Sequence, residues 1–371
     1  MKDKIKEIFA RLSDLMTLSG YVSRNADAVG NLALEYTGSF FDKENTSISP
    51  GGSISLYKPP HAEDAGTLMI DSHIDTVGMT VSEILPEGFV AFTNVGGIDS
   101  RILPSLPVKL CGKGEVLRGV VCSVPPHLMR GKEPKAPKIS ELYIDTGYPS
   151  EYLERVCPVG TPIVYEYNPL IMSCGEGDRI TSPYLDDKLC AAAAIAAFSE
   201  FTSDEVECGI ILSLSANEET NGEGALFAAR HTPSAAIVLD VNFASGKGVP
   251  DYASATIGKG ISISYSAATS RTLTRELDGV LTKSGIPFKR IAEPCDTGTN
   301  ATRLAPSHLG TPCAVMSVPI SYMHTPCECA SLRDAESMAR GIQVFSKAFL
   351  AGDGYADRRF IKRLGEVSDG E

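Results

Sequence analysis

Five positions along the chain carry side chains that bind divalent metal ions in proteins, and each lies at or just beyond the end of an apolar segment. They are His73 with Asp75, Asp186 with Asp187, Glu218 with Glu219, Asp240, and His324. One such residue would mean little. Five sites in this order combine two histidines with several carboxylates, which are the ligand types of dinuclear hydrolases. The sequence therefore predicts a two-metal hydrolase site assembled from loops at one edge of a sheet.

The first and fourth positions lie on segments that read as strands. His73 and Asp75 are separated by one residue, so on an extended segment both side chains point to the same side. This spacing suits His73 as a ligand and Asp75 as the residue that orients its imidazole, although a hydrogen-bonded histidine near a surface turn is the alternative. Asp240 lies inside the apolar segment 237–241. A carboxylate in a buried strand must be paired or metal-bound, so Asp240 is a predicted ligand.

Two pairs of consecutive acidic residues complete the set. Asp186 and Asp187 precede an Ala-rich segment, where one of them could cap a helix. Two exceed what a cap requires, and a carboxylate can bridge two cations through its two oxygens, so we place the bridge here. Glu218 and Glu219 follow the apolar segment 209–215. One can bind metal while the other takes a proton from the attacking water, and a solvated acidic turn is the alternative.

Other candidate ligands and motifs lack such a setting. The remaining histidines, predicted to have no metal role, are His61, His127, His231 and His308. Cys327 and Cys329 follow His324, but a C-x-C pair without a matching partner is too weak to predict a thiolate site. The Gly-Lys-Gly fragments 246–248 and 258–260 do not follow a strand, so they do not indicate a phosphate-binding loop.

The elements that must position these residues follow from the apolar runs. Buried strands are predicted at 67–73, 209–215, 235–241 and 313–318, and helices at 187–201, 222–230 and 332–350. An amphipathic helix opens the chain, with Gly20 as its stop, and Ser331 with Asp334 is predicted to cap the last helix. Strands that alternate with helices indicate an α/β fold, with a mixed, largely parallel sheet covered by helices on both faces.

The region between residues 79 and 172 differs from the rest of the chain in composition and in its pattern of apolar residues. It is rich in Gly, Pro and Val, contains short apolar runs and lacks a convincing long helix. Short strands separated by turn signals indicate a small β-barrel or sandwich. We therefore expect an inserted β domain at 79–172, which interrupts a catalytic domain formed by residues 1–78 and 173–371.

Composition narrows the class of protein. The 371 residues include 34 basic and 46 acidic residues, for a formal net charge of −12, which disfavours a surface for nucleic acid or an anionic membrane. The charged N-terminus does not read as a signal peptide, and no apolar run reaches the roughly 18 residues of a membrane span. The ten cysteines are scattered without a disulfide framework, so reduced thiols and a cytoplasmic location are expected.

The five sites together resemble the TET-type metalloaminopeptidases, a family that includes deblocking and glutamyl aminopeptidases and members labelled endoglucanase. The resemblance covers nearly the whole chain. The motifs that carry it, in the family's order and approximate spacing, are His73-x-Asp75, Asp186-Asp187, Glu218-Glu219, Asp240 and Met323-His324-Thr325-Pro326. Within the predicted insertion, Gly119-Val120-Val121 with Pro125-Pro126-His127-Leu128 resembles a family signature.

The resemblance implies a phosphorylase/aminopeptidase-like core with two divalent ions per subunit, zinc or cobalt first and manganese as a further option. It implies that His73, Asp186 and Asp240 hold one ion. It implies that Asp186, Glu219 and His324 hold the other. Glu218 would be the general base and Asp75 the partner of His73. A cis peptide bond after Asp186 and a homo-oligomer, a dodecamer built from dimers through the inserted domain, are also implied.

Two residues depart from the family pattern. Asn300 stands where the family commonly has Asp, and Ser321 stands where it commonly has Arg. The predicted metal ligands are unaffected. Each departure removes a charge near the expected pocket, so both bear on substrate recognition.

The combined prediction is an intracellular aminopeptidase that removes N-terminal residues from peptides. Two metals would polarise the scissile carbonyl and bind the attacking water, whose proton Glu218 would take. A two-metal dipeptidase or N-deacylase shares the same core and is the main alternative. A glycosidase mechanism needs two carboxylates and would give His73 and Asp240 no role. A non-catalytic relic would have no reason to keep Glu218.

Overall fold

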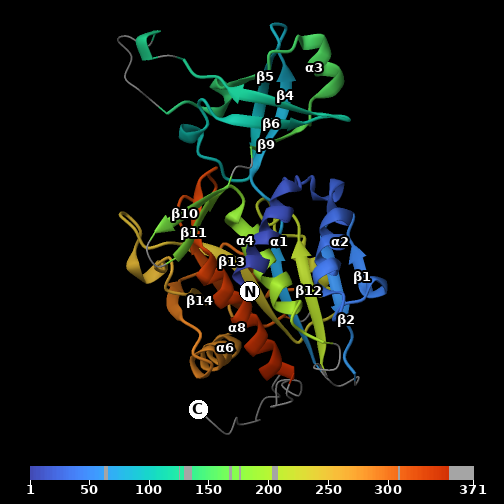
Figure 1. Cartoon of the computed structure of the whole chain (residues 1–371), viewed down its shortest axis with the longest axis vertical. Coiled ribbons are helices and arrows are strands. Elements are labelled where there is room, and N and C mark those ends of the chain that lie inside the picture. Colours follow the sequence, from blue (N-terminus) through green and yellow to red (C-terminus); the bar gives the residue numbers. More distant parts are fainter. Residues whose placement is uncertain are drawn as a thin grey trace.

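The structure is a computed structural model that describes residues 1–61, 66–124, 126–128, 136–166, 169–174, 177–202, 208–307 and 310–350 (Figure 1). Two residues discussed above, Pro125 and His308, lie outside this description.

An eight-stranded mixed sheet forms the main body of the molecule. In spatial order its strands are β1 (Thr46–Ile48), β2 (Ile54–Lys58), β12 (Gly209–Ser215), β3 (Thr67–His73), β13 (Ala235–Phe243), β16 (Cys313–Ile320), β14 (Ile261–Ser266) and β15 (Phe288–Glu293). The four central strands, β12, β3, β13 and β16, are mutually parallel. Their carboxyl ends therefore meet at one edge of the sheet, which is where ligands bind in sheets of this kind.

Helices cover both faces of this sheet, as predicted. One face packs against α1 (Lys2–Asp14), α2 (Ala26–Thr37), α4 (Leu185–Phe198), α6 (Arg271–Lys283) and α8 (Leu332–Leu350). The other face packs against the short helices α5 (Ala225–Ala229) and α7 (Ala301–Leu304). Every residue of α4 is buried, because this Ala-rich helix lies between the sheet and helices α1 and α8. Within the described residues, no helix has the length and apolar character needed to cross a membrane.

The predicted element boundaries are largely confirmed. Strands β3 and β12 have the predicted bounds, and β13 and β16 each extend two residues further, to Phe243 and Ile320. Helix α5 is shorter than the predicted 222–230, since Gly222 adopts a positive φ of 66° that does not belong to a right-handed helix. Helix α1 ends at Asp14 rather than near Gly20, because the following residues extend and Leu18 forms a bridge with Thr76.

The predicted cap of α8 is correct for one residue and wrong for the other. The Ser331 hydroxyl accepts a hydrogen bond from the N–H of Arg333 at 3.2 Å. Asp334 instead accepts hydrogen bonds from the N–H groups of Gly258 (2.6 Å) and Gly260 (2.7 Å). This buried carboxylate therefore fixes the loop before β14 to the start of α8, and it does not reach back to the cap.

A closed six-stranded antiparallel barrel forms a second body at one end of the molecule (Figure 1). Around the barrel its strands are β4 (Gly78–Ile84), β5 (Phe89–Val95), β8 (Tyr143–Asp145), β7 (Val116–Val121), β6 (Pro107–Cys111) and β9 (Pro162–Tyr165). It encloses its own apolar core and carries helix α3 (Ser150–Val156). The predicted small β-barrel is therefore present, whereas the exact domain limits stay a prediction.

A small three-stranded sheet, formed by two strands that follow the barrel and one strand near the C-terminal end of the described chain, bears directly on the site. Its strands, in order, are β10 (Leu170–Cys174), β11 (Gly177–Ser182) and β17 (Glu328–Ser331). Strand β11 leads into α4, and β17 leads into α8. The pairing of β11 with β17 therefore brings the start of α4 and the loop that precedes β17 side by side.

Candidate metal centre

The structure brings all five predicted metal ligands together at the carboxyl edge of the parallel strands. His73 is the last residue of β3, and Asp240 lies near the end of β13. Glu219 follows β12, His324 follows β16, and Asp186 lies at the start of α4. Among the described residues, two groups have ligand atoms within 4.8 Å of one another. They are His73 with Asp186 and Asp240, and Asp186 with Glu219 and His324.

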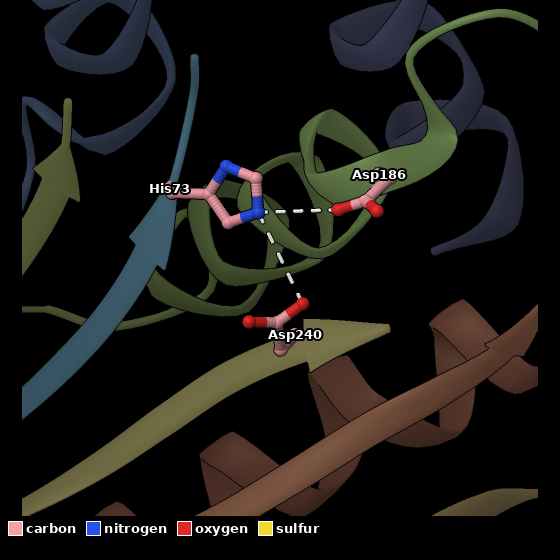
Figure 2. Close-up of side chains that lie close together, drawn as sticks. All are labelled: His73, Asp186 and Asp240. Carbon is pink, nitrogen blue, oxygen red and sulfur yellow. Dashed lines mark hydrogen bonds and ion pairs between the residues drawn. The ribbon is translucent and has the colours of Figure 1, made fainter. Parts of the chain in front are cut away.

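The first group comes from three separate elements whose side chains point at a common centre (Figure 2). Nε2 of His73 lies 3.1 Å from Oδ1 of Asp186 and 3.9 Å from Oδ1 of Asp240. All three residues are buried, with exposed fractions of 1%, 6% and 5%. An imidazole nitrogen and two carboxylate oxygens at this spacing leave room for one cation between them.

The second group shares Asp186 with the first. Nε2 of His324 lies 3.3 Å from Oδ2 of Asp186 and 3.3 Å from Oε2 of Glu219. Asp186 therefore directs Oδ1 at one histidine and Oδ2 at the other. A carboxylate that offers one oxygen to each of two ligand groups has the arrangement of a bridging ligand.

The backbone around Asp186 is irregular. The Asp186–Asp187 peptide bond is cis, as the resemblance implies, and Tyr184 has a positive φ of 71°. Neither aspartate caps the helix, because the carboxylate of Asp186 faces the histidines and Oδ2 of Asp187 accepts a hydrogen bond from the Ser72 hydroxyl at 2.5 Å. The two adjacent aspartates thus have different partners: Asp186 faces the two histidines, and Asp187 is bonded to Ser72.

Both histidines are held in the same way. Nδ1 of His73 lies 3.0 Å from the backbone oxygen of Asp75, and Nδ1 of His324 lies 2.8 Å from the backbone oxygen of Gly97. A carbonyl oxygen can only accept, so Nδ1 carries the hydrogen in both rings. When such an imidazole is neutral, as it is in a metal-bound histidine, its lone pair is at Nε2, which here faces the carboxylates. This is the tautomer that a metal-binding histidine needs.

Asp75 lies beside Nδ1 of His73, and its backbone oxygen is the nearer contact. Its carboxylate Oδ1 is 3.6 Å from Nδ1 of His73, further than the backbone oxygen of the same residue. The carboxylate oxygens instead accept hydrogen bonds from the N–H groups of Glu218 (3.0 Å) and Glu219 (3.2 Å). The completely buried Asp75 thus also fixes the turn that carries these two glutamates.

Glu218 lies beside the first group without belonging to it. Its Oε2 is 4.0 Å from Nε2 of His73, and its side chain is 16% exposed, more than Glu219 at 6%. Desolvation raises the pKa of Glu218 to about 7. A carboxylate with this pKa, open to solvent at the edge of a ligand cluster, has the position and basicity of a general base near neutral pH.

The buried carboxylates of the two ligand groups favour the binding of cations. Desolvation raises the pKa of Glu219 and of Asp240 well above the usual range, and Oδ2 of Asp240 is buried with no hydrogen-bond partner among the described residues. Asp186 is also desolvated, but hydrogen bonds from His324 and His73 lower its pKa. Burying several carboxylates together is unfavourable unless protons or metal ions neutralise them. Two histidines and three carboxylates therefore fit two divalent transition-metal ions.

We expect metal binding to release protons and to strengthen as pH rises. Without metal, the carboxyls of Glu219 and Asp240 have raised pKa values. At a pH below those pKa values the carboxyls hold protons, and a cation must displace these protons to bind. Calorimetric titration of the metal-free protein with Zn²⁺ in buffers of different ionisation enthalpy would count those protons at about pH 6 and about pH 8. An affinity that is equal at both pH values, with no proton release, would contradict this electrostatic account.

An open pocket of about 530 Å³ adjoins the cluster and gives access to it. Glu218, Glu219 and His324 form part of its lining, and Asp296 and Arg303 add one charge of each sign. Its polar lining and its position beside both ligand groups suit the charged end of a peptide.

The two departures from the family pattern lie outside the lining of this pocket. The amide nitrogen of the buried Asn300 donates hydrogen bonds to Oδ2 of Asp71 and to the Ser215 hydroxyl, both at 2.9 Å. An aspartate at position 300 would place a second buried carboxylate against Asp71, whereas an amide supplies a donor. Ser321 forms a backbone bridge with Cys329 at the start of the His324 loop.

The other described histidines and the two cysteines belong to neither ligand group. His61 and His127 are exposed, and His231 stacks on Tyr57 with ring centroids 4.2 Å apart. Cys327 is exposed, and Cys329 is buried in β17. Sequence reasoning missed Glu328, a buried residue of β17 that contacts both Asp186 and His324. Its position four residues after His324 was the only available signal.

Comparison with known proteins gives a consistent result. Residues 52–340 match the family described as M42 glutamyl aminopeptidase. The lysyl aminopeptidase of Pyrococcus furiosus is 30% identical over 283 residues, which cover 74% of this chain and 79% of that protein. An aminopeptidase structure from the archaeon Desulfurococcus kamchatkensis has a TM-score of 0.83 at 26% identity, covering 94% of this chain and 95% of that one.

A further solved structure belongs to the group that the sequence motifs resemble. The TET1 peptidase of Pyrococcus horikoshii has a TM-score of 0.78 at 25% identity, covering 92% of this chain and 99% of that one. That protein is described as assembling into a tetrahedron or a large octahedral shell. The resemblance to TET-type aminopeptidases is therefore confirmed. The chain belongs to the M42 glutamyl aminopeptidase family and acts as an aminopeptidase.

Proposed function

We propose that the chain is a dinuclear metal-dependent aminopeptidase. One divalent ion would be held by His73, Asp186 and Asp240, and the other by Asp186, Glu219 and His324, with zinc or cobalt first and manganese as a further option. The observation that carries this proposal is the position of Asp186, which offers one oxygen to each histidine. When bound, such ions supply Lewis acidity at the scissile carbonyl and at the attacking water.

Glu218 is the general base of the proposed reaction. Its carboxylate lies at the border of the cluster and the open pocket, so it can reach a water molecule at the reacting centre. It takes the proton of that water as the water attacks, and then gives the proton to the amine that leaves. Asp75 keeps this carboxylate in place through the two N–H groups of the turn that it holds.

A peptide pool in which half of the members are N-acetylated tests the proposed function. The protein is incubated with zinc, cobalt or manganese, with and without a chelator, and the products are read by mass spectrometry. We expect stepwise trimming of the free-amine peptides only, abolished by the chelator. Release of acyl groups would instead support the N-deacylase alternative. No cleavage with any of the three metals would contradict the proposal.

We also propose that residues 79–172 form an inserted domain, between catalytic segments 1–78 and 173–371, and that it contributes contacts in a homo-oligomer. Large apolar side chains are exposed on adjacent barrel strands, with Val116 58%, Val120 48% and Tyr143 36% exposed. The tetrahedral assembly described for the TET1 peptidase supports a dodecamer built from dimers. Sedimentation of a stable monomer would contradict this assembly.

We propose a cytoplasmic location because cysteines of this chain are free thiols. Eight of the described cysteines are free thiols: Cys111, Cys122, Cys157, Cys190, Cys295, Cys313, Cys327 and Cys329. Free thiols are typical of proteins in reducing compartments.

A further inference from the structure

We propose that Glu328 is a positioning residue, which holds the two loops that carry Asp186 and His324 in the relative placement that a two-metal centre needs. The proposal rests on the dinuclear centre proposed above and assigns a role to a residue outside it. Glu328 is the first residue of β17 and is 2% exposed. Within the described part of the chain, it belongs to neither ligand group.

The carboxylate of Glu328 ties two ligands together through their backbones. Oε1 accepts a hydrogen bond from the N–H of His324 at 2.7 Å, and Oε2 accepts one from the N–H of Asp186 at 3.2 Å. Each oxygen thus serves one ligand. His324 and Asp186 also meet at the second ligand group, where Nε2 lies 3.3 Å from Oδ2. The two residues are therefore fixed to each other at the backbone and at the side chain.

Both loops have backbone conformations that need support from their surroundings. Tyr322 and His324 have positive φ values of 63° and 62°, and Tyr184 has a φ of 71°. Residues with a Cβ rarely adopt this left-handed region and remain there only where neighbouring contacts fix them. Hydrogen bonds that two backbone N–H groups donate to one buried carboxyl group are contacts of this kind.

The small sheet places Glu328 between the two loops. Glu328 lies opposite Ser182 in the pairing of β17 with β11, and β11 leads directly to the Asp186 loop. Cys329, the next residue, forms the bridge with Ser321 that closes the His324 loop. The sheet therefore fixes where each loop starts or ends, and the Glu328 side chain fixes the ligands themselves.

A direct role of Glu328 as a metal ligand fits the contacts less well. Both of its oxygens already accept backbone hydrogen bonds, and among the described residues Glu328 belongs to neither group of ligand atoms. Its influence on a metal ion therefore passes through Asp186 and His324. Outer partners that orient metal ligands commonly change metal affinity by about 10-fold to about 100-fold when they are replaced.

The variant Glu328→Gln tests this role, since glutamine has nearly the same shape but only one acceptor oxygen. Its NH₂ group would face one of the two backbone N–H groups, so one hydrogen bond is lost. We expect Co²⁺ titration of the metal-free protein, followed by visible absorption, to show one of two binding steps weakened by about 10-fold to about 100-fold. The absorption bands of that ion should also change, because its ligands move.

Asp334→Asn is a matched control. Asp334 is another buried carboxylate that accepts hydrogen bonds from two backbone N–H groups, those of Gly258 and Gly260, but it touches neither loop. We expect this variant to lower thermal stability and to leave both Co²⁺ steps and the spectrum unchanged. Equal losses of Co²⁺ affinity in the two variants, or wild-type affinity and spectrum in Glu328→Gln, would overturn the proposal.

If Glu328→Gln does not fold, Glu328→Asp serves as the second variant, because it keeps the charge and withdraws both oxygens by one methylene. The same weakened step is expected, and wild-type Co²⁺ affinity in the folded variant would overturn the proposal. These readouts do not depend on peptide cleavage. If the wild-type protein binds two Co²⁺ ions but trims no peptide, that result would contradict the proposed function and would not affect the proposed role of Glu328.

Discussion

Replacement of Glu218 by glutamine is expected to lower kcat for peptide hydrolysis by about 100-fold to about 10,000-fold, the usual contribution of a general base. The amide cannot take a proton from the attacking water. Metal content should stay at the wild-type level, because Glu218 lies beside the ligand groups without belonging to either. Steady-state kinetics and metal analysis on the same sample make the measurement.

Glu223→Gln is the matched control for this prediction. Glu223 lies on the same acidic turn, accepts a hydrogen bond from the Asn217 amide at 3.4 Å and is not part of the pocket lining. Its kcat should stay within a few-fold of wild type. If Glu218→Gln instead loses metal, Glu218 is a ligand and its proposed role as the base is wrong.

Replacement of Asp240 by alanine is expected to remove the metal ion held with His73. Asp240 is one of three ligands in that group, and loss of a ligand should weaken binding by more than the roughly 100-fold seen for outer partners. The fold should survive, because desolvation already raises the pKa of this buried carboxyl and its Oδ2 has no hydrogen-bond partner in the part of the chain that the structure describes. Metal content per subunit after dialysis gives the result.

Asp71→Asn provides a comparison at a similar depth. Asp71 lies in β3 opposite Val238 of β13, is completely buried and is bonded to Asn300 rather than to a ligand group. This variant should retain both ions. Unchanged metal occupancy in Asp240→Ala would exclude Asp240 from the ligand set, and metal loss in both variants would point to general disruption of the sheet.

The sheet and the ligand residues could be predicted because both leave local signals in the sequence. Strands buried on both faces require continuous apolar runs, and β3 and β12 were located to the residue for that reason. Ligands at the ends of such strands follow from the parallel arrangement, which gathers carboxyl ends at one edge. Asp240 stood out because an isolated carboxylate in a buried strand needs a partner.

The contacts that support the ligands could not be predicted in the same way. Glu328 and Asp75 act through backbone N–H groups of residues distant in sequence, and any residue type offers such a group. Asp334 has the spacing of a capping residue, but its carboxylate bonds to the loop at Gly258. From the sequence, Asn300 indicates only that a charge is missing near the expected pocket. The hydrogen bond between Asn300 and Asp71 is visible only in three dimensions.

We propose that this chain holds two divalent ions, one between His73, Asp186 and Asp240 and the other between Asp186, Glu219 and His324. Crystals of the protein grown with Zn²⁺, with diffraction recorded on both sides of the zinc absorption edge, test this proposal most directly. We expect two anomalous peaks, one in each group, with Asp186 between them. An absence of peaks at these residues under saturating Zn²⁺, or a single peak that Asp186 does not contact, would contradict it.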